Sequence, residues 1–86
     1  MDVPVRNASL VDQVFSILLS RISDDTYPAG SQFPTESELA EEFSVSRSTI
    51  RTAILKLEDR KLLFRKPGVG TYVSESINIS NPLNEF

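Results

Sequence analysis

The sequence predicts a mainly α-helical fold with one small β-hairpin, in the order three helices and then two short strands. Three observations lead to this fold class. Apolar residues recur at helical spacing in three segments, residues able to cap a helix precede each segment, and a Pro/Gly turn separates two short runs of aromatic and branched residues. With 86 residues, 40% of them hydrophobic, the chain has room for one domain with a modest core.

A long first helix is predicted to begin at Leu10, because Ser9 can accept a hydrogen bond from an amide of the first turn. Pro28 and Gly30 oppose a helix, so its end is expected at residues 27–30. Its apolar side chains form two neighbouring stripes, and we expect the second in the core, with contact to another domain as the alternative. The stripes are Leu10, Val14, Ile17 and Leu18, and then Val11, Phe15, Leu19 and Ile22.

Two further helices follow, each with its own start signal. Thr35 and Glu38 match a capping box, which predicts a helix from about Glu36. The apolar pattern then stops, and Ser46 is a good N-cap, so a third helix is predicted over about residues 46–60. The inward-facing residues are Leu39, Ala40 and Phe43 in the second helix, and Ile50, Ala53, Ile54 and Leu57 in the third.

A β-hairpin is predicted after the third helix. Residues 62–66 and 71–73 are rich in aromatic and branched side chains, and they flank a Pro/Gly turn at residues 67–70. A short strand near Gln32 and Phe33 is compatible with the pattern.

The remaining segments suggest how the chain is organised. We expect a domain over residues 9–74, a flexible arm at residues 1–8, and a polar, turn-prone linker at residues 75–86. The N-terminus lacks a basic region followed by an apolar run, and no apolar stretch approaches the ~20 residues of a membrane span. The sequence therefore favours a cytoplasmic protein without membrane contact.

The absence of cysteine and histidine limits the chemistry available to this chain. It excludes disulfides, thiolate or imidazole metal sites, and nucleophiles activated by histidine. The carboxylates of residues 36–42 suit helix-start and surface positions better than an acid-base site. We expect no enzyme activity, no cofactor and no metal.

The distribution of charge matters more than its total. The net charge of −3 argues globally against a nucleic-acid partner. However, residues 47–66 contain seven basic and two acidic residues, a local charge of +5, and the remainder carries −8. Because salt screens exposed charges beyond about 8 Å, a locally positive surface can still bind phosphates.

Basic and hydroxyl residues gather at the start of the predicted third helix. Arg47 and Arg51 share one helical face, where each guanidinium can bind guanine O6 and N7 or a phosphate. Ser46, Ser48 and Thr49 can donate to phosphate oxygens at the positive end of the helix. Two helices joined by a tight turn, with the second presenting such residues, are typical of a helix that enters the major groove of DNA.

The predicted hairpin complements this helix. Gly68 and Gly70 lie at its tip, where the lack of a Cβ lets the backbone approach a sugar-phosphate wall or enter a minor groove. Arg65 and Lys66 can bind phosphates beside them. Residues 65–71 are therefore predicted to form a wing in the minor groove.

Three sequence blocks resemble those of GntR-type regulators. They are PTESELA at residues 34–40, VSRSTIRTAILKL at residues 45–57, and GVGTYV at residues 68–73, and the resemblance covers about residues 10–73. It implies a winged helix-turn-helix that binds double-stranded operator DNA. The DNA contacts that it implies are Arg47, Ser48, Thr49 and Arg51, with Ser46 capping the recognition helix near a phosphate and Gly68 at the minor-groove tip.

The resemblance also implies partners. GntR-like proteins join such a domain to a C-terminal domain that binds a small-molecule effector and forms a homodimer, and no residues here resemble one. We therefore expect this chain to be part of a longer bacterial transcriptional regulator, to end in its linker, and to be monomeric without the dimerising domain.

Three residues depart from the family pattern. Ser37 stands where many relatives carry an arginine directed at DNA, so one contact is shortened or lost. Ser44 stands in a turn where glycine is frequent, at a cost of roughly 0.5–1 kcal/mol if the backbone is left-handed. Lys61 stands where glycine commonly follows the recognition helix, so the helix end can close differently.

Simpler and rival interpretations remain open. Lys56, Arg60 and Lys61 can pair with Glu58 and Asp59 on a solvated surface, as basic helical faces usually do. The two glycines can serve a turn as well as a groove contact, and we expect both roles. The rival functions are a winged-helix protein-protein interaction module, which should have an apolar or acidic face, and an RNA or single-strand module, which should present aromatic stacking platforms.

Overall fold

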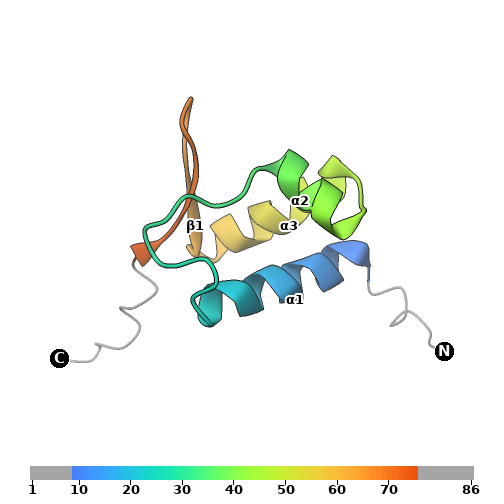
Figure 1. Cartoon of the computed structure of the whole chain (residues 1–86), viewed down its shortest axis with the longest axis horizontal. Helices are drawn as coiled ribbons and strands as arrows, with labels where there is room; N and C mark the ends of the chain where they lie inside the picture. Colours follow the sequence, from blue (N-terminus) through green and yellow to red (C-terminus); the bar gives the residue numbers. More distant parts are fainter. Residues whose placement is uncertain (1–8, 76–86) are drawn as a thin grey trace.

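The computed structural model describes residues 9–75 and confirms the predicted order of elements. Three helices precede a two-stranded antiparallel sheet; they are α1 (Leu10–Ser23), α2 (Glu36–Phe43), α3 (Arg47–Asp59), β1 (Leu63–Lys66) and β2 (Gly70–Val73). Figure 1 shows the hairpin projecting away from the helices as a wing. The predicted arm and residues 76–86 of the predicted linker lie outside the described residues.

All three helices begin at the predicted caps. The Ser9 hydroxyl accepts from the Asp12 amide at 3.2 Å, and the Ser46 hydroxyl accepts from the Thr49 amide at 3.1 Å. At α2 both bonds of the capping box are present, because Thr35 accepts from the Glu38 amide at 3.1 Å while the Glu38 carboxylate accepts from the Thr35 amide at 2.9 Å. Local side-chain chemistry therefore sets each helix start.

The end of α1 was predicted wrongly. The helix stops at Ser23, before the Pro/Gly segment at residues 27–30. The Asp24 carboxylate accepts from the Thr26 amide at 2.9 Å and from the Thr26 hydroxyl at 2.6 Å, and Asp25 has a φ of 67°. This aspartate turn offers the backbone hydrogen bonds that compete with a further helical turn.

One core joins every element. Helix α1 packs on α3, and α3 also packs on α2 and β1. The inward face of α1 runs between the two predicted stripes: Val14, Leu18 and Ile22 are buried, whereas Leu10 and Ile17 remain 53% and 41% exposed. The second stripe does pack against the core, as predicted. The buried residues are Val14, Leu18, Ile22, Phe33, Leu39, Ile50, Ala53, Ile54, Leu57, Leu63 and Val73.

The wing is attached to the body through the loop that follows α1. Its strands pair from Leu63 opposite Val73 to Lys66 opposite Gly70. The Phe33 amide donates to the Thr71 carbonyl at 2.7 Å, and the Val73 amide donates to the Ser31 carbonyl at 2.9 Å. The short strand expected near residues 32–33 is thus a single bridge from Gln32 to Tyr72, which holds the base of the wing in place.

Two departures from the family pattern occupy left-handed backbone. Ser44, the C-cap of α2, has φ 55° and ψ 46°, and Lys61, just after α3, has a φ of 66°. These conformations close the helix ends: the Val45 amide donates to the Ala40 carbonyl at 3.1 Å, and the Leu62 amide donates to the Leu57 carbonyl at 3.0 Å. A side chain with a Cβ is strained at both sites.

We predict that Ser44→Gly stabilises the protein by about 0.5–1 kcal/mol, because it relieves the left-handed strain at the C-cap. Thermal unfolding should show a higher midpoint. The matched control is Ser37→Gly on the exposed face of α2, which should cost a similar amount because glycine is unfavourable inside a helix. Destabilisation by both substitutions would show that the conformation of Ser44 costs nothing.

Candidate nucleic-acid interface

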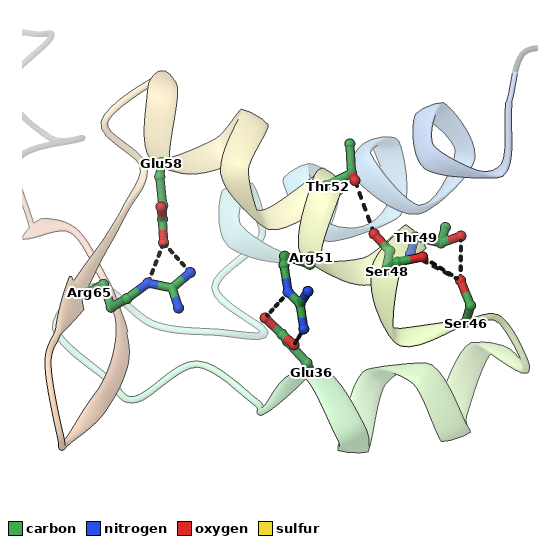
Figure 2. A network of polar contacts seen from close by, with 8 residues as sticks. All are labelled: Glu36, Ser46, Ser48, Thr49, Arg51, Thr52, Glu58 and Arg65. Atoms are coloured by element: carbon green, nitrogen blue, oxygen red, sulfur yellow. Dashed lines mark hydrogen bonds and ion pairs between the residues drawn. The ribbon is translucent and has the colours of Figure 1, made fainter.

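The amino end of α3 presents a cluster of hydroxyl groups to solvent. The Ser46 Oγ lies 3.2 Å from the Ser48 Oγ and 2.9 Å from the Thr49 Oγ1 (Figure 2). Thr52 instead donates to the Ser48 carbonyl at 3.0 Å, so its hydroxyl serves the helix backbone. Free amides and hydroxyl donors at a helix amino end form a favourable place for an anionic oxygen.

The two predicted DNA-binding arginines of α3 differ in their surroundings. Both are exposed, but Arg51 donates from Nε to Oε2 of Glu36 at 3.2 Å and from Nη2 to Oε1 at 3.0 Å (Figure 2). Among residues 9–75, Arg47 has no ion-pair partner. These hydrogen bonds lower the pKa of Glu36 and raise the pKa of Arg51, so both groups are charged at neutral pH.

The two basic residues of the wing lie on opposite faces of the hairpin. Arg65 extends toward α3, where its Nη2 lies 3.0 Å from Oε2 of Glu58. Lys66 lies over the rings of Tyr72 and Phe64, with its ammonium 4.7 Å and 5.8 Å from their centroids. Adjacent strand residues alternate between faces, which explains the separation.

The expected pairing of Glu58 with neighbouring lysines or arginine was wrong. Glu58 binds Arg65 across seven residues of sequence instead. Arg60 stacks on Phe15 of α1, with its guanidinium carbon 4.9 Å from the ring centroid. The sequence carried no signal for Glu36 or Glu58 as arginine partners, because these pairs depend on how α2 and the wing pack around α3.

The two wing glycines have different requirements. Gly68 has a φ of 78°, and a Cβ built there would meet no atom within 4 Å. Gly70 has a φ of 148°, and a Cβ there would lie 2.6 Å from the Gln32 amide nitrogen. The positive φ strains a side chain with a Cβ at both positions; at Gly70 the Cβ would also displace the end of the exposed Gln32 side chain, whereas the space around Gly68 is open.

A groove of about 300 Å³ lies between the start of α2, the start of α3 and the wing. It brings together side chains from three segments that are distant in sequence. Ser37, exposed at the first turn of α2, lies at this groove, so the position that departs from the family pattern faces the predicted site. The polar side chains that line the groove are Gln32, Thr35, Glu36, Ser37, Arg47, Arg65 and Thr71.

The described part of the chain was found to contain neither a metal-binding cluster nor a membrane span. Residues 9–75 contain no group of three acidic, histidine or cysteine side chains that could hold a metal ion. No helix in this range is long and apolar enough to cross a membrane.

Known bacterial regulators resemble this chain in sequence. The family model described as "Bacterial regulatory proteins, gntR family" matches residues 10–73. The probable fructoselysine utilization operon transcriptional repressor of Escherichia coli K12 is 46% identical over 66 residues, which is 77% of this chain and 27% of that protein. The histidine utilization repressor of Pseudomonas putida is 38% identical over 68 residues, with 79% and 27% covered. The chain thus spans about a quarter of the length of these relatives.

Solved structures resemble it as well. The DNA-binding domain of AraR in complex with operator ORR3 matches with a TM-score of 0.71 and 39% identity, over 74% of this chain and 77% of that one. Streptococcus agalactiae GntR matches with a TM-score of 0.69 and 45% identity, over 78% and 33% of the two chains. The three helices and the wing are therefore those of a winged helix DNA-binding domain, and the chain belongs to the GntR family of bacterial regulatory proteins.

Proposed function

We propose that this chain binds double-stranded operator DNA with the recognition helix, residues 46–60, in the major groove and the wing, residues 65–71, in the minor groove. One observation carries the proposal: the amino end of α3 is exposed, and Arg47 there lines the same groove as Arg65 of the wing. A major-groove helix and a neighbouring wing can thus contact one duplex together. The proposed contact residues are Ser46, Arg47, Ser48, Thr49, Arg51, Arg65, Lys66, Gly68 and Gly70.

Within this site the contacts have different tasks. The arginines of α3 suit base edges, because a guanidinium matches guanine O6 and N7. The hydroxyls of Ser46, Ser48 and Thr49 suit phosphates, which position the helix without specifying sequence. Lys66 extends along the outer face of the wing, where its charge can bind the backbone of the minor groove.

We further propose that this domain, residues 9–74, acts within a longer transcriptional regulator. The two repressors named above are about four times its length, which supports the presence of a further domain. That domain would bind a small-molecule effector and form a homodimer. Residues 75–86 would then be the linker and residues 1–8 an N-terminal arm. Since its target is bacterial DNA, the regulator would act in the cytoplasm.

A selection of duplexes from a random library tests the function directly. We predict enrichment of a sequence that contains G·C pairs, and we predict that Arg47→Ala and Arg51→Ala each weaken binding to it by about 1–3 kcal/mol and relax the preference at one base pair. Lys61→Ala removes the same charge outside α3 and should change affinity much less. No enrichment at all would favour a protein-interaction module instead.

Substitutions at Gly68 distinguish a purely structural turn from a contact with the minor groove of DNA. Gly68→Asn tolerates the left-handed backbone, so it should leave thermal stability nearly unchanged while its side chain weakens DNA binding at the tip. Gly68→Val adds backbone strain and should lower both. Gel-shift titration and thermal unfolding measure the two effects, and unchanged DNA binding by Gly68→Asn would remove the tip from the interface.

The 86-residue chain should be monomeric and should bind one half-site with strong salt dependence. When two such domains are linked, binding of one raises the effective concentration of the other at its half-site. A single domain lacks this gain, which is commonly about 10²–10⁴ in avidity. Each neutralised phosphate contributes about 0.9 to the log-log slope of affinity against salt. Sedimentation and a salt series provide the measurement. A tight dimer, or affinity independent of salt, would contradict this proposal.

A further inference from the structure

The contact between Arg51 and Glu36 leaves one edge of the guanidinium available. A guanidinium has five N–H donors arranged in a rigid fork. Glu36 accepts from Nε and from one hydrogen of Nη2, so it covers the side edge of the group. No hydrogen bond among residues 9–75 uses the end edge, which is formed by Nη1 and the other hydrogen of Nη2. This edge has the parallel donor geometry that guanine O6 and N7 accept.

The side chain of Glu36 is partly buried, whereas the side chain of Arg51 is exposed to solvent. The Glu36 side chain is 22% exposed and the Arg51 side chain is 54% exposed. Glu36 is also the first residue of α2, between Thr35 and Glu38, whose capping box fixes the start of that helix. The Glu36 carboxylate therefore projects from a capped helix and holds the Arg51 guanidinium by two hydrogen bonds.

We propose that Glu36 is a positioning residue that holds Arg51 with its end edge toward the major groove and thereby sets the preference for guanine at one base pair. This inference rests on the proposed function. Ordering a free arginine side chain on binding costs conformational entropy, and a guanidinium already held in place loses less. The gain is largest where the donors meet two parallel acceptors, as on guanine.

The negative charge of Glu36 also affects binding to duplexes that lack the preferred base pair. It lies in the groove beside Arg47 and Arg65, where it opposes the approach of any phosphate backbone. Non-specific binding depends almost entirely on charge, whereas specific binding also depends on the arginine geometry. The same carboxylate therefore raises affinity for the preferred duplex and lowers affinity for the others.

The decisive variant is Glu36→Gln, which removes the charge and keeps the shape. On the enriched duplex it should weaken binding about 10-fold, comparable to losing part of a bidentate base contact. On a duplex with that G·C pair replaced, it should leave binding unchanged or tighten it. The matched control is Glu41→Gln, an exposed carboxylate of α2 outside this pair, which should shift both duplexes in the same direction.

A double-mutant cycle separates positioning from direct contact. In the Arg51→Ala background, Glu36→Gln should no longer weaken specific binding, because no guanidinium is left to position. A loss that persists in that background would show that Glu36 contacts a base itself, and would overturn the proposal. Equal effects of Glu36→Gln and Glu41→Gln would also overturn it. Thermal unfolding of each variant shows whether the fold is kept.

The same experiments distinguish failure of DNA binding from failure of the positioning role of Glu36. If the wild-type chain enriches no duplex, the proposed function itself is wrong. If it enriches one and Arg51→Ala relaxes a base pair while Glu36→Gln does not, the function stands and the positioning role is refuted.

Discussion

Burial of one face of α3 is the constraint on which the rest of this domain depends. Ile50, Ala53 and Leu57 are completely buried, and the helix packs on α1, α2 and β1 at once. Because the apolar stripe fixes the rotation of the helix, Ser48 faces away from the core, while Arg47 and Arg51 project from the flank of the helix beside the groove. A modest core of aliphatic side chains therefore determines which residues a duplex can meet.

The wing depends on a second, backbone-mediated constraint. The loop that follows α1 forms hydrogen bonds with β2 on either side of Gln32, and Phe33 from the same loop is buried beside Tyr27, with ring centroids 4.9 Å apart. An isolated two-stranded hairpin is only marginally stable in water. Its attachment to the loop, together with the Arg65–Glu58 pair, orients the tip relative to the recognition helix.

Because this chain has a net charge of −3 and DNA is also negatively charged, binding must depend on local geometry more than on net charge. Two of the basic residues proposed to contact DNA, Arg51 and Arg65, are already paired with carboxylates of the same chain. Exposed pairs of this kind contribute little to stability, about 0–1 kcal/mol. Their larger effect is to reduce the free positive charge and to orient what remains, which favours discrimination between sequences over indiscriminate affinity.

Short-range chemistry made the helix starts, the core stripe of α3 and the hairpin predictable from the residues alone. Ser9, Thr35 and Ser46 act within one helical turn, and a Pro/Gly turn acts within four residues, so neighbours in sequence carry the whole signal. The early end of α1 was missed because the aspartate turn competed with a stronger-looking Pro/Gly signal. The carboxylate partners of Arg51 and Arg65 could not be predicted in this way. They arise only when packing brings α2, α3 and the hairpin together, because an ion pair across 15 residues has no periodicity in sequence.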